Sequence, residues 1–128
     1  MKKPASILIV DDNLTNLKLA RIVLESGGYE VTDATNSVEV FDILESFHPQ
    51  LILMDLQLPG MSGLEITRLL KGKKETQDII ILAITAYAMK GDEEKAIEAG
   101  CDGYITKPIN TRTLSGVIEQ YLTRRETP

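Results

Sequence analysis

The chain has 128 residues, of which 43% are hydrophobic and 26% charged, and its formal net charge is −5. These are ordinary values for a globular protein, and the length fits one domain, which we place at residues 1–128. The acidic balance disfavours binding to nucleic acid or to anionic membranes. Cys101 is the one cysteine, so no intrachain disulfide can form, and the N-terminal apolar run is too short for a signal peptide. We therefore expect a cytoplasmic protein without a membrane span.

Five segments have the composition of β-strands. The first, third and fourth are continuous runs of branched apolar residues, which are typical of strands buried on both faces of a sheet. The second and fifth are more polar, as edge strands are. In chain order the predicted strands cover residues 7–10, 29–34, 51–54, 79–84 and 103–106.

Helical spacing fills the intervals between these strands. Capping-box spacing at Asn36/Glu39 and Ser62/Glu65 predicts the starts of the second and third helices, and Gly27-Gly28 and Gly100 predict the ends of the first and fourth. The expected buried stripes are Leu19, Ala20, Val23 and Leu24 in the first helix, Val40, Ile43, Leu44 and Phe47 in the second, Ile66, Leu69 and Leu70 in the third, and Leu114, Val117, Ile118, Tyr121 and Leu122 in the fifth.

Strands that alternate with helices predict an α/β fold, in which a parallel sheet carries helices on both faces. The three apolar strands belong in the centre, which gives a doubly wound five-stranded sheet of order 2-1-3-4-5 with five helices. Ligands of such sheets bind at the carboxyl ends of the strands where the winding reverses, here between the first and third strands. Asp11 and Asp12 follow the first strand and Asp55 follows the third.

Acidic residues at this edge predict a cation site. Each pair of carboxylates about 4 Å apart costs on the order of 4 kcal/mol at an effective dielectric near 20. Hard oxygen ligands suit Mg²⁺. Lys107 follows the fifth strand and Thr85 follows the fourth, which adds an ammonium group and a hydroxyl at the same edge. Any of these residues alone fits a turn or a cap, but together they favour phosphoryl transfer to a carboxylate.

Four motifs stand at these strand ends. They are Ile9-Val10-Asp11-Asp12-Asn13, the segment Leu53-Met54-Asp55-Leu56-Gln57-Leu58-Pro59-Gly60-Met61-Ser62-Gly63, the pair Thr85-Ala86, and Gly103-Tyr104-Ile105-Thr106-Lys107-Pro108. Over essentially the whole chain they resemble the receiver domain of bacterial two-component response regulators. Residues 85–94 also resemble single-domain regulators of the DivK type.

The resemblance implies that Asp55 takes a phosphoryl group from a phosphohistidine of a sensor histidine kinase or a histidine phosphotransfer protein. It implies Mg²⁺ or Mn²⁺ held by the side chains of Asp12 and Asp55 and the backbone carbonyl of Gln57, with Asp11 acting through a metal-bound water. It implies that Lys107 contacts the phosphoryl group and that the Lys107-Pro108 peptide bond is cis.

The resemblance also implies a switch. Thr85 and Tyr104 would move together and alter the surface formed by the fourth helix, fifth strand and fifth helix, where a downstream target protein binds. Gln57 and Tyr87 flank the site and would tune the lifetime of the phosphoryl group. Such a chain catalyses its own phosphorylation and dephosphorylation and is not a turnover enzyme.

Four residues of the first helix lie off its predicted buried stripe and beside the acidic site, namely Leu14, Leu17, Lys18 and Arg21. They are either ordinary surface or a face that docks the helical bundle carrying the donor histidine.

Other functions fit the sequence less well. An aspartate-nucleophile phosphatase carries a second acid two residues after the nucleophile, where this chain has Gln57. Flavodoxin-like binding needs a phosphate-cradling loop after the first strand, where Asp11 and Asp12 would repel a phosphate. An interaction module without phosphorylation stays open, as does the excised receiver of a longer regulator or hybrid kinase.

Overall fold

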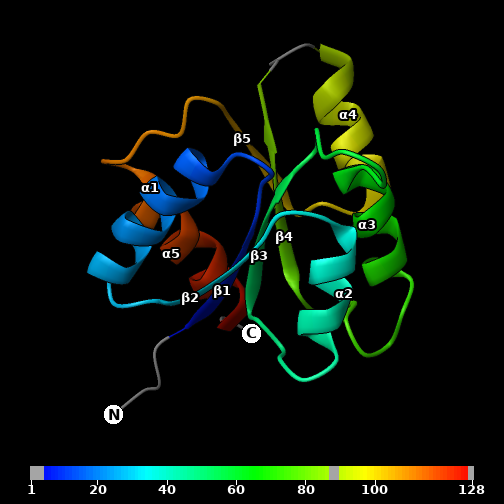
Figure 1. The fold of residues 1–128 in the computed structure, drawn as a ribbon, viewed down its shortest axis with the longest axis horizontal. Helices are drawn as coiled ribbons and strands as arrows, with labels where there is room; N and C mark the ends of the chain where they lie inside the picture. Colours follow the sequence, from blue (N-terminus) through cyan, green and yellow to red (C-terminus); the bar gives the residue numbers. More distant parts are fainter. Residues whose placement is uncertain (1–4, 87–89, 127–128) are drawn as a thin grey trace.

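A five-stranded parallel sheet lies between two layers of helices (Figure 1). The computed structural model describes residues 5–86 and 90–126. The strands are β1 (Ser6–Val10), β2 (Glu30–Ala34), β3 (Leu51–Asp55), β4 (Ile80–Thr85) and β5 (Gly103–Thr106), and the helices are α1 (Leu14–Ser26), α2 (Ser37–Leu44), α3 (Gly63–Lys71), α4 (Lys90–Ala99) and α5 (Leu114–Glu126).

The strand order is β2-β1-β3-β4-β5, which confirms the predicted doubly wound α/β fold. Helices α1 and α5 cover one face of the sheet, and α2, α3 and α4 cover the other (Figure 1). All strand pairs are parallel, with Val10 opposite Met54 and Asp55 opposite Ile84. The carboxyl ends of β1, β3 and β4 therefore meet at one edge of the sheet.

The pleat of the sheet sends alternate side chains into two separate cores. Leu8, Ile52 and Ile81 pack with the layer of α2, α3 and α4. Ile9 and Leu53, one residue further along their strands, pack with α1 and α5. Every residue of β3 is buried, which explains why its sequence is continuously apolar up to Asp55.

The buried face of α1 differs from the predicted one. Leu17, placed off the buried stripe, is only 4% exposed and packs in the core with Ala20 and Leu24, whereas Leu19, placed in that stripe, is 45% exposed. The prediction was wrong because α1 carries apolar residues around much of its circumference, so the spacing allows more than one face to point inward. Ile22, for example, is 56% exposed.

A similar correction applies to α3. Leu69 was predicted to be buried but is 43% exposed. Thr67 is fully buried in this helix, because its hydroxyl donates to the carbonyl oxygen of Gly63 at 2.8 Å and so needs no water. Because threonine is polar, nothing in the sequence indicated that position 67 faces the core.

The predicted helix caps are confirmed. The side chain of Asn36 accepts from the Glu39 N–H at 3.0 Å, and Ser62 Oγ accepts from the Glu65 N–H at 3.3 Å. Gly28 and Gly100 follow α1 and α4 with φ of 92° and 110°, which a glycine adopts without strain. The two N-caps therefore fix where α2 and α3 begin, and the two glycines follow the ends of α1 and α4.

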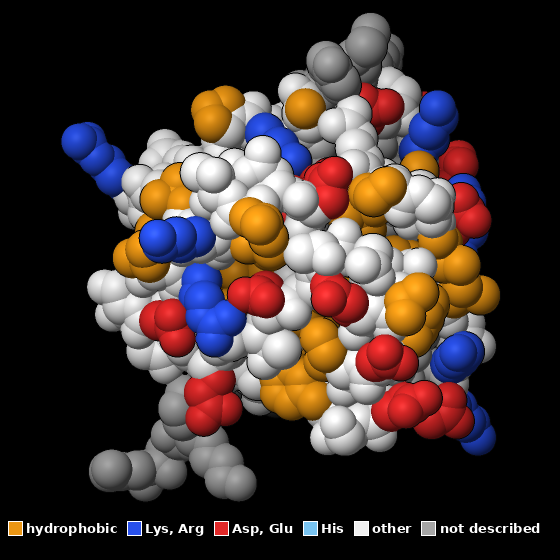
Figure 2. Space-filling view, viewed as in Figure 1, with side chains coloured by type: hydrophobic (Ala, Val, Ile, Leu, Met, Phe, Trp, Pro, Cys, Tyr) orange, Lys and Arg blue, Asp and Glu red, His pale blue; other side chains and the backbone are white. Residues whose placement is uncertain are grey.

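Charges of both signs are distributed over the surface. On the face shown in Figure 2, Lys and Arg side chains are scattered among acidic and apolar ones and form no continuous basic surface over the residues that the structure describes. In residues 5–86 and 90–126, no helix combines the length and the apolar character that crossing a membrane requires.

Candidate functional site

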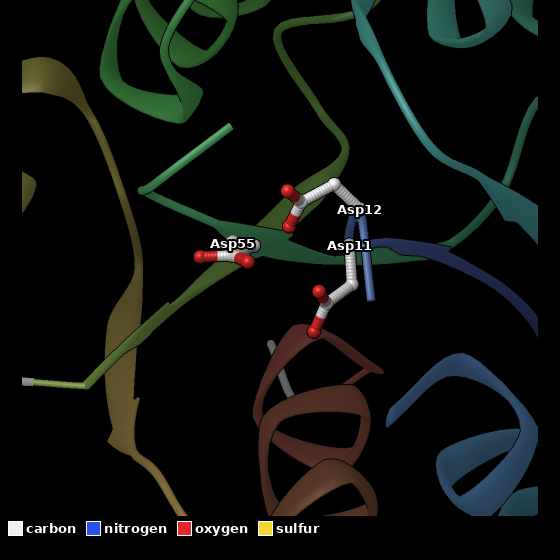
Figure 3. Close-up of side chains that lie close together, drawn as sticks. All are labelled: Asp11, Asp12 and Asp55. Carbon is white, nitrogen blue, oxygen red and sulfur yellow. The ribbon is translucent and has the colours of Figure 1, made fainter. Parts of the chain in front are cut away.

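Three carboxylates converge at the carboxyl ends of β1 and β3 (Figure 3). Oxygens of Asp11, Asp12 and Asp55 lie within 4.8 Å of one another. Asp11 and Asp55 are each 1% exposed, while Asp12 is exposed to solvent. The predicted grouping of these residues is therefore present, with one side of the cluster open.

Backbone amides orient the two buried carboxylates. The Asn13 N–H donates to Asp11 Oδ1 at 2.9 Å, and the Gln57 N–H donates to Asp55 Oδ1 at 2.9 Å. Each amide lies two residues after its aspartate, in the loop that leaves the strand. One oxygen of each carboxylate is thus engaged by the chain, and the other faces the remainder of the site.

Lys107 supplies a cation to the cluster. Its Nζ lies 3.0 Å from Asp55 Oδ2 and 3.5 Å from Asp11 Oδ2. Its backbone N–H donates to the Thr85 carbonyl at 2.7 Å, which fixes the loop after β5 beside the end of β4. The peptide bond from Lys107 to Pro108 is cis, as the family resemblance implied.

The pKa values of two groups reflect this crowding. Burial, followed by repulsion from Asp55, raises the pKa of Asp11, although the Asn13 amide and Lys107 oppose the shift. Burial opposes the charge of Lys107, but the hydrogen bond and attraction of Asp55, together with the charge of Asp11, outweigh it and raise the pKa of the ammonium group. Lys107 is therefore fully charged at neutral pH, while the carboxylates repel one another.

The oxygen cluster suits a hard divalent cation. Three carboxylates against one ammonium group leave an excess of negative charge. Mg²⁺ uses one or two carboxylates and keeps several waters, which the open side at Asp12 permits. Asp11, Asp12 and Asp55 are the residues that could hold it, and the loop at Gln57 adjoins them.

Thr85 and Tyr104 lie on neighbouring strands. Thr85 ends β4 and is 3% exposed, one residue beyond the partner of Asp55. Tyr104 pairs with Ala83 in the adjacent strand, is half-buried, and packs against the core on the side of α2, α3 and α4. Residues two apart on a strand point to the same face, so Thr85 and Tyr104 are diagonal neighbours.

The predicted partner face on α1 is only partly exposed. Leu14 is 72% exposed and Lys18 is exposed, but Leu17 lies in the core. Arg21 pairs with Asp33 at 2.7 Å, and also with Glu25. Tyr87 lies outside the residues that the structure describes.

A cavity beside this face was not predicted. It has a volume of ≈ 340 Å³ and lies between α1 and the loop after β5, with Asn16, Leu19, Lys107, Pro108 and Leu114 among its lining residues. No local sequence signal marks it, because its two walls, residues 16–20 and 107–114, lie far apart in the chain.

Comparison with known proteins agrees with this site. Residues 7–119 match the family model of the response regulator receiver domain. The polar-differentiation response regulator DivK of Brucella anthropi is 46% identical over 119 residues, which are 93% of this chain and 97% of that protein. A CheY-like receiver domain protein of Methanospirillum hungatei is 32% identical, with a TM-score of 0.88 over 96% of this chain and 97% of that one.

A further solved structure is the receiver domain of a sensor histidine kinase from Pseudomonas aeruginosa, described with a magnesium ion coordinated in the active site cleft. It is 30% identical, with a TM-score of 0.85 over 94% of this chain and 98% of that one. The family match, the strand order and the group of carboxylates with a lysine lead to one assignment. The chain belongs to the response regulator receiver domain family and is similar to the DivK regulators.

Proposed function

We propose that Asp55 accepts a phosphoryl group from a phosphohistidine of a sensor histidine kinase or a histidine phosphotransfer protein, in a reaction that depends on Mg²⁺ or Mn²⁺. The observation that supports this most directly is the placement of Asp55. Its carboxylate is buried, lies 3.0 Å from Lys107 and belongs to a group of three carboxylates within 4.8 Å. Such a set can attack phosphorus and also neutralise the charge on the phosphoryl oxygens.

The transfer forms one bond and breaks one. A carboxylate oxygen of Asp55 bonds to phosphorus while the P–N bond to the donor imidazole breaks, and the bonding electrons leave with the imidazole nitrogen. Lys107, released from its contact with Asp55 Oδ2, donates to a phosphoryl oxygen. The amide of Gln57 keeps the attacking carboxylate oriented through Oδ1.

A bound divalent cation supplies charge neutralisation for the phosphoryl oxygens. Asp12 and Asp55 would hold it with their side chains and Gln57 with its backbone carbonyl, while Asp11 would act through a bound water. The excess negative charge of the site supports this assignment, as does the oxygen chemistry of the donors.

Phosphorylation would act as a switch between two populations. Phosphoryl oxygens beside Thr85 attract its hydroxyl, and Tyr104 is the diagonal neighbour that would repack. The changed surface would comprise α4, β5 and α5 and would contact a target protein. The chain would then modify and reset itself rather than turn over an external substrate, with Gln57 and Tyr87 tuning the lifetime.

Intact mass spectrometry tests the phosphoacceptor. The chain is incubated with Mg²⁺ and acetyl phosphate, and we expect an adduct of one phosphoryl group that is absent from Asp55→Asn and lost when EDTA removes the cation. Asp33→Asn is the matched control, because Asp33 pairs with Arg21 on the surface and lies outside the site. No adduct on the unaltered chain would instead favour an interaction module without phosphorylation, and an adduct on Asp55→Asn would place the acceptor elsewhere.

The donor would approach over the exposed part of α1. Leu14 is 72% exposed at the start of this helix, two residues after Asp12. We expect Leu14→Glu to slow transfer from a phosphorylated histidine protein while leaving phosphorylation by acetyl phosphate unchanged. Leu69→Glu is the control, since Leu69 is an exposed apolar residue near the C-terminal end of α3, away from the proposed docking face on α1. Equal slowing by both substitutions would refute this docking face.

A further inference from the structure

Gly63 begins α3 and lies directly against the backbone of Asp55. A Cβ at position 63 would overlap the carbonyl oxygen of Asp55 and would lie 3.0 Å from both the Asp55 carbonyl carbon and the Cα of Leu56. These neighbours are main-chain atoms, which cannot rotate aside as a flexible side chain could. The helix approaches the strand end this closely because residue 63 has no side chain.

The peptide unit that Gly63 touches is held from its other side. The N–H of Leu56 belongs to the same peptide unit as the Asp55 carbonyl, and it donates to the Ile84 carbonyl of β4 at 3.0 Å. The N–H of Gly63 in turn donates to the Leu56 carbonyl at 3.4 Å. The Asp55–Leu56 peptide therefore lies between β4 and the first turn of α3.

Helix α3 is itself held in place by core packing and a buried hydrogen bond. Ile66 and Leu70 are 0% and 1% exposed in the core, and Thr67 donates to the Gly63 carbonyl at 2.8 Å. A side chain at position 63 would consequently have to move either the helix or the Asp55–Leu56 peptide, by a distance on the order of 1 Å. Displacements of this size at a reacting group can cost about a hundredfold in rate.

We propose that Gly63 is a positioning residue for the phosphoacceptor. It lets α3 press the Asp55–Leu56 peptide against β4, and this contact sets where the Asp55 carboxylate meets Lys107 and where the loop at Gln57 passes the site. The inference rests on the proposed function of Asp55. Gly63 itself touches no reacting atom.

The test compares Gly63→Ala with Ser62→Ala and with the unaltered chain. Ser62→Ala removes the N-cap of the same helix, so it weakens α3 without placing an atom against Asp55. Three quantities are measured: the amide chemical shifts of Leu56 and Gln57 in the metal-free protein, the dissociation constant for Mg²⁺ by calorimetry, and the rate of phosphorylation by acetyl phosphate. Urea unfolding reports the stability of each variant.

For Gly63→Ala we expect shifted Leu56 and Gln57 amides, at least tenfold weaker Mg²⁺ binding and at least tenfold slower phosphorylation. For Ser62→Ala we expect both constants within threefold of the unaltered chain, even at equal loss of stability. Gly63→Ala values within threefold of the unaltered chain would overturn the proposal, and so would equal losses in Ser62→Ala.

If Gly63→Ala does not fold in buffer, all three proteins are measured in an osmolyte that favours the folded state. A chain that stays unfolded there contradicts the proposal, because Gly63 would then serve the stability of the fold and not the placement of Asp55. Absence of phosphorylation in the unaltered chain would refute the proposed function alone. The amide shifts and the Mg²⁺ affinity would then still show whether Gly63 sets the placement of the Asp55–Leu56 peptide.

Discussion

Replacing Asp11 with asparagine is expected to stabilise the metal-free protein at pH 7. Asparagine keeps the shape of the side chain and the oxygen that accepts from the Asn13 N–H, but it carries no charge. At an effective dielectric near 20, repulsion from Asp55, whose oxygen lies within 4.8 Å, is at least about 3.5 kcal/mol, and attraction to Lys107 at 3.5 Å is about 5 kcal/mol.

The exposed Asp12 adds a screened repulsion to that from Asp55, so for the Asp11 charge the total repulsion and the attraction to Lys107 nearly cancel. The cost of holding a charge on a carboxyl that is 1% exposed then decides the sign. We expect Asp11→Asn to raise the free energy of unfolding by about 1 to 2 kcal/mol, which corresponds to a rise of roughly 0.5 to 1 M in the urea midpoint.

The pH dependence follows from the raised pKa of Asp11. Since the folded chain binds this proton more tightly than the unfolded chain, ionisation of Asp11 lowers stability as the pH rises through the folded pKa. The advantage of Asp11→Asn should therefore be larger at pH 7 than in acid and disappear as the pH falls towards the ordinary pKa of an aspartate.

Urea unfolding followed by circular dichroism at several pH values measures this advantage. Asp33→Asn is the control, because it breaks a surface pair with Arg21 and should cost at most about 1 kcal/mol. Adding Mg²⁺ should stabilise the unaltered chain more than Asp11→Asn, since at a given concentration a cation that binds the folded state more tightly stabilises it more. An Asp11→Asn protein that is less stable at pH 7, or whose advantage persists in acid, would refute the electrostatic reasoning.

Four other substitutions test the site and the scaffold separately. Lys107→Met should slow phosphorylation by acetyl phosphate at least tenfold, because the contact with Asp55 at 3.0 Å is lost; an unchanged rate of adduct formation by mass spectrometry would contradict this. Leu17→Ala should lower the free energy of unfolding by about 2 to 4 kcal/mol and Leu14→Ala by at most about 0.5 kcal/mol, and equal effects in urea unfolding would contradict the observed face of α1. Lys71→Met should lower the free energy of unfolding by about 2 to 3 kcal/mol, because Lys71 Nζ donates to the Ile79 carbonyl at 2.7 Å and pairs with the Asp102 carboxylate at 3.0 Å. It should leave the phosphorylation rate unchanged, and a slowed rate would show that this contact is coupled to the site.

The sheet could be predicted because its central strands carry an unmistakable composition. Strands buried on both faces must be apolar throughout, and the three such runs of this chain became β1, β3 and β4. Placing these three strands in the centre and the more polar ones at the edges then gave the doubly wound order 2-1-3-4-5. The observed bounds differ by about one residue, as at β4, which begins at Ile80 and includes Thr85.

The faces of the helices were harder to predict. In α1, the spacing of apolar residues favoured Leu19, yet the helix buries Leu17, because packing against the sheet and α5 selects one face among several apolar ones. In α3, the buried polar residue Thr67 replaces the expected Leu69, because its hydroxyl finds a carbonyl partner inside the helix. Both outcomes depend on tertiary contacts that periodicity does not contain.

The site could be predicted in outline for a different reason. Parallel strands bring their carboxyl ends to one edge, so Asp11, Asp55 and Lys107 had to lie near one another once the strand order was known. What the sequence does not encode locally is close approach between distant segments. The cavity between α1 and the loop after β5 arises only on packing. The contact of Gly63 with the Asp55 carbonyl spans only a short loop, but it too depends on how that loop folds.

The two cores on opposite faces of the sheet bear on which surfaces a bound partner would cover. By the alternation of the pleat, Asp55 follows Leu53 on the side of α1 and α5, whereas Thr85 follows Ala83 on the side of α2, α3 and α4. A donor that reaches Asp55 across α1, as proposed above, would lie on the face of α1 and α5 and would leave α4, on the opposite face, uncovered. Under that proposal, a target protein that contacts α4 would not compete with the donor for the same face of the sheet.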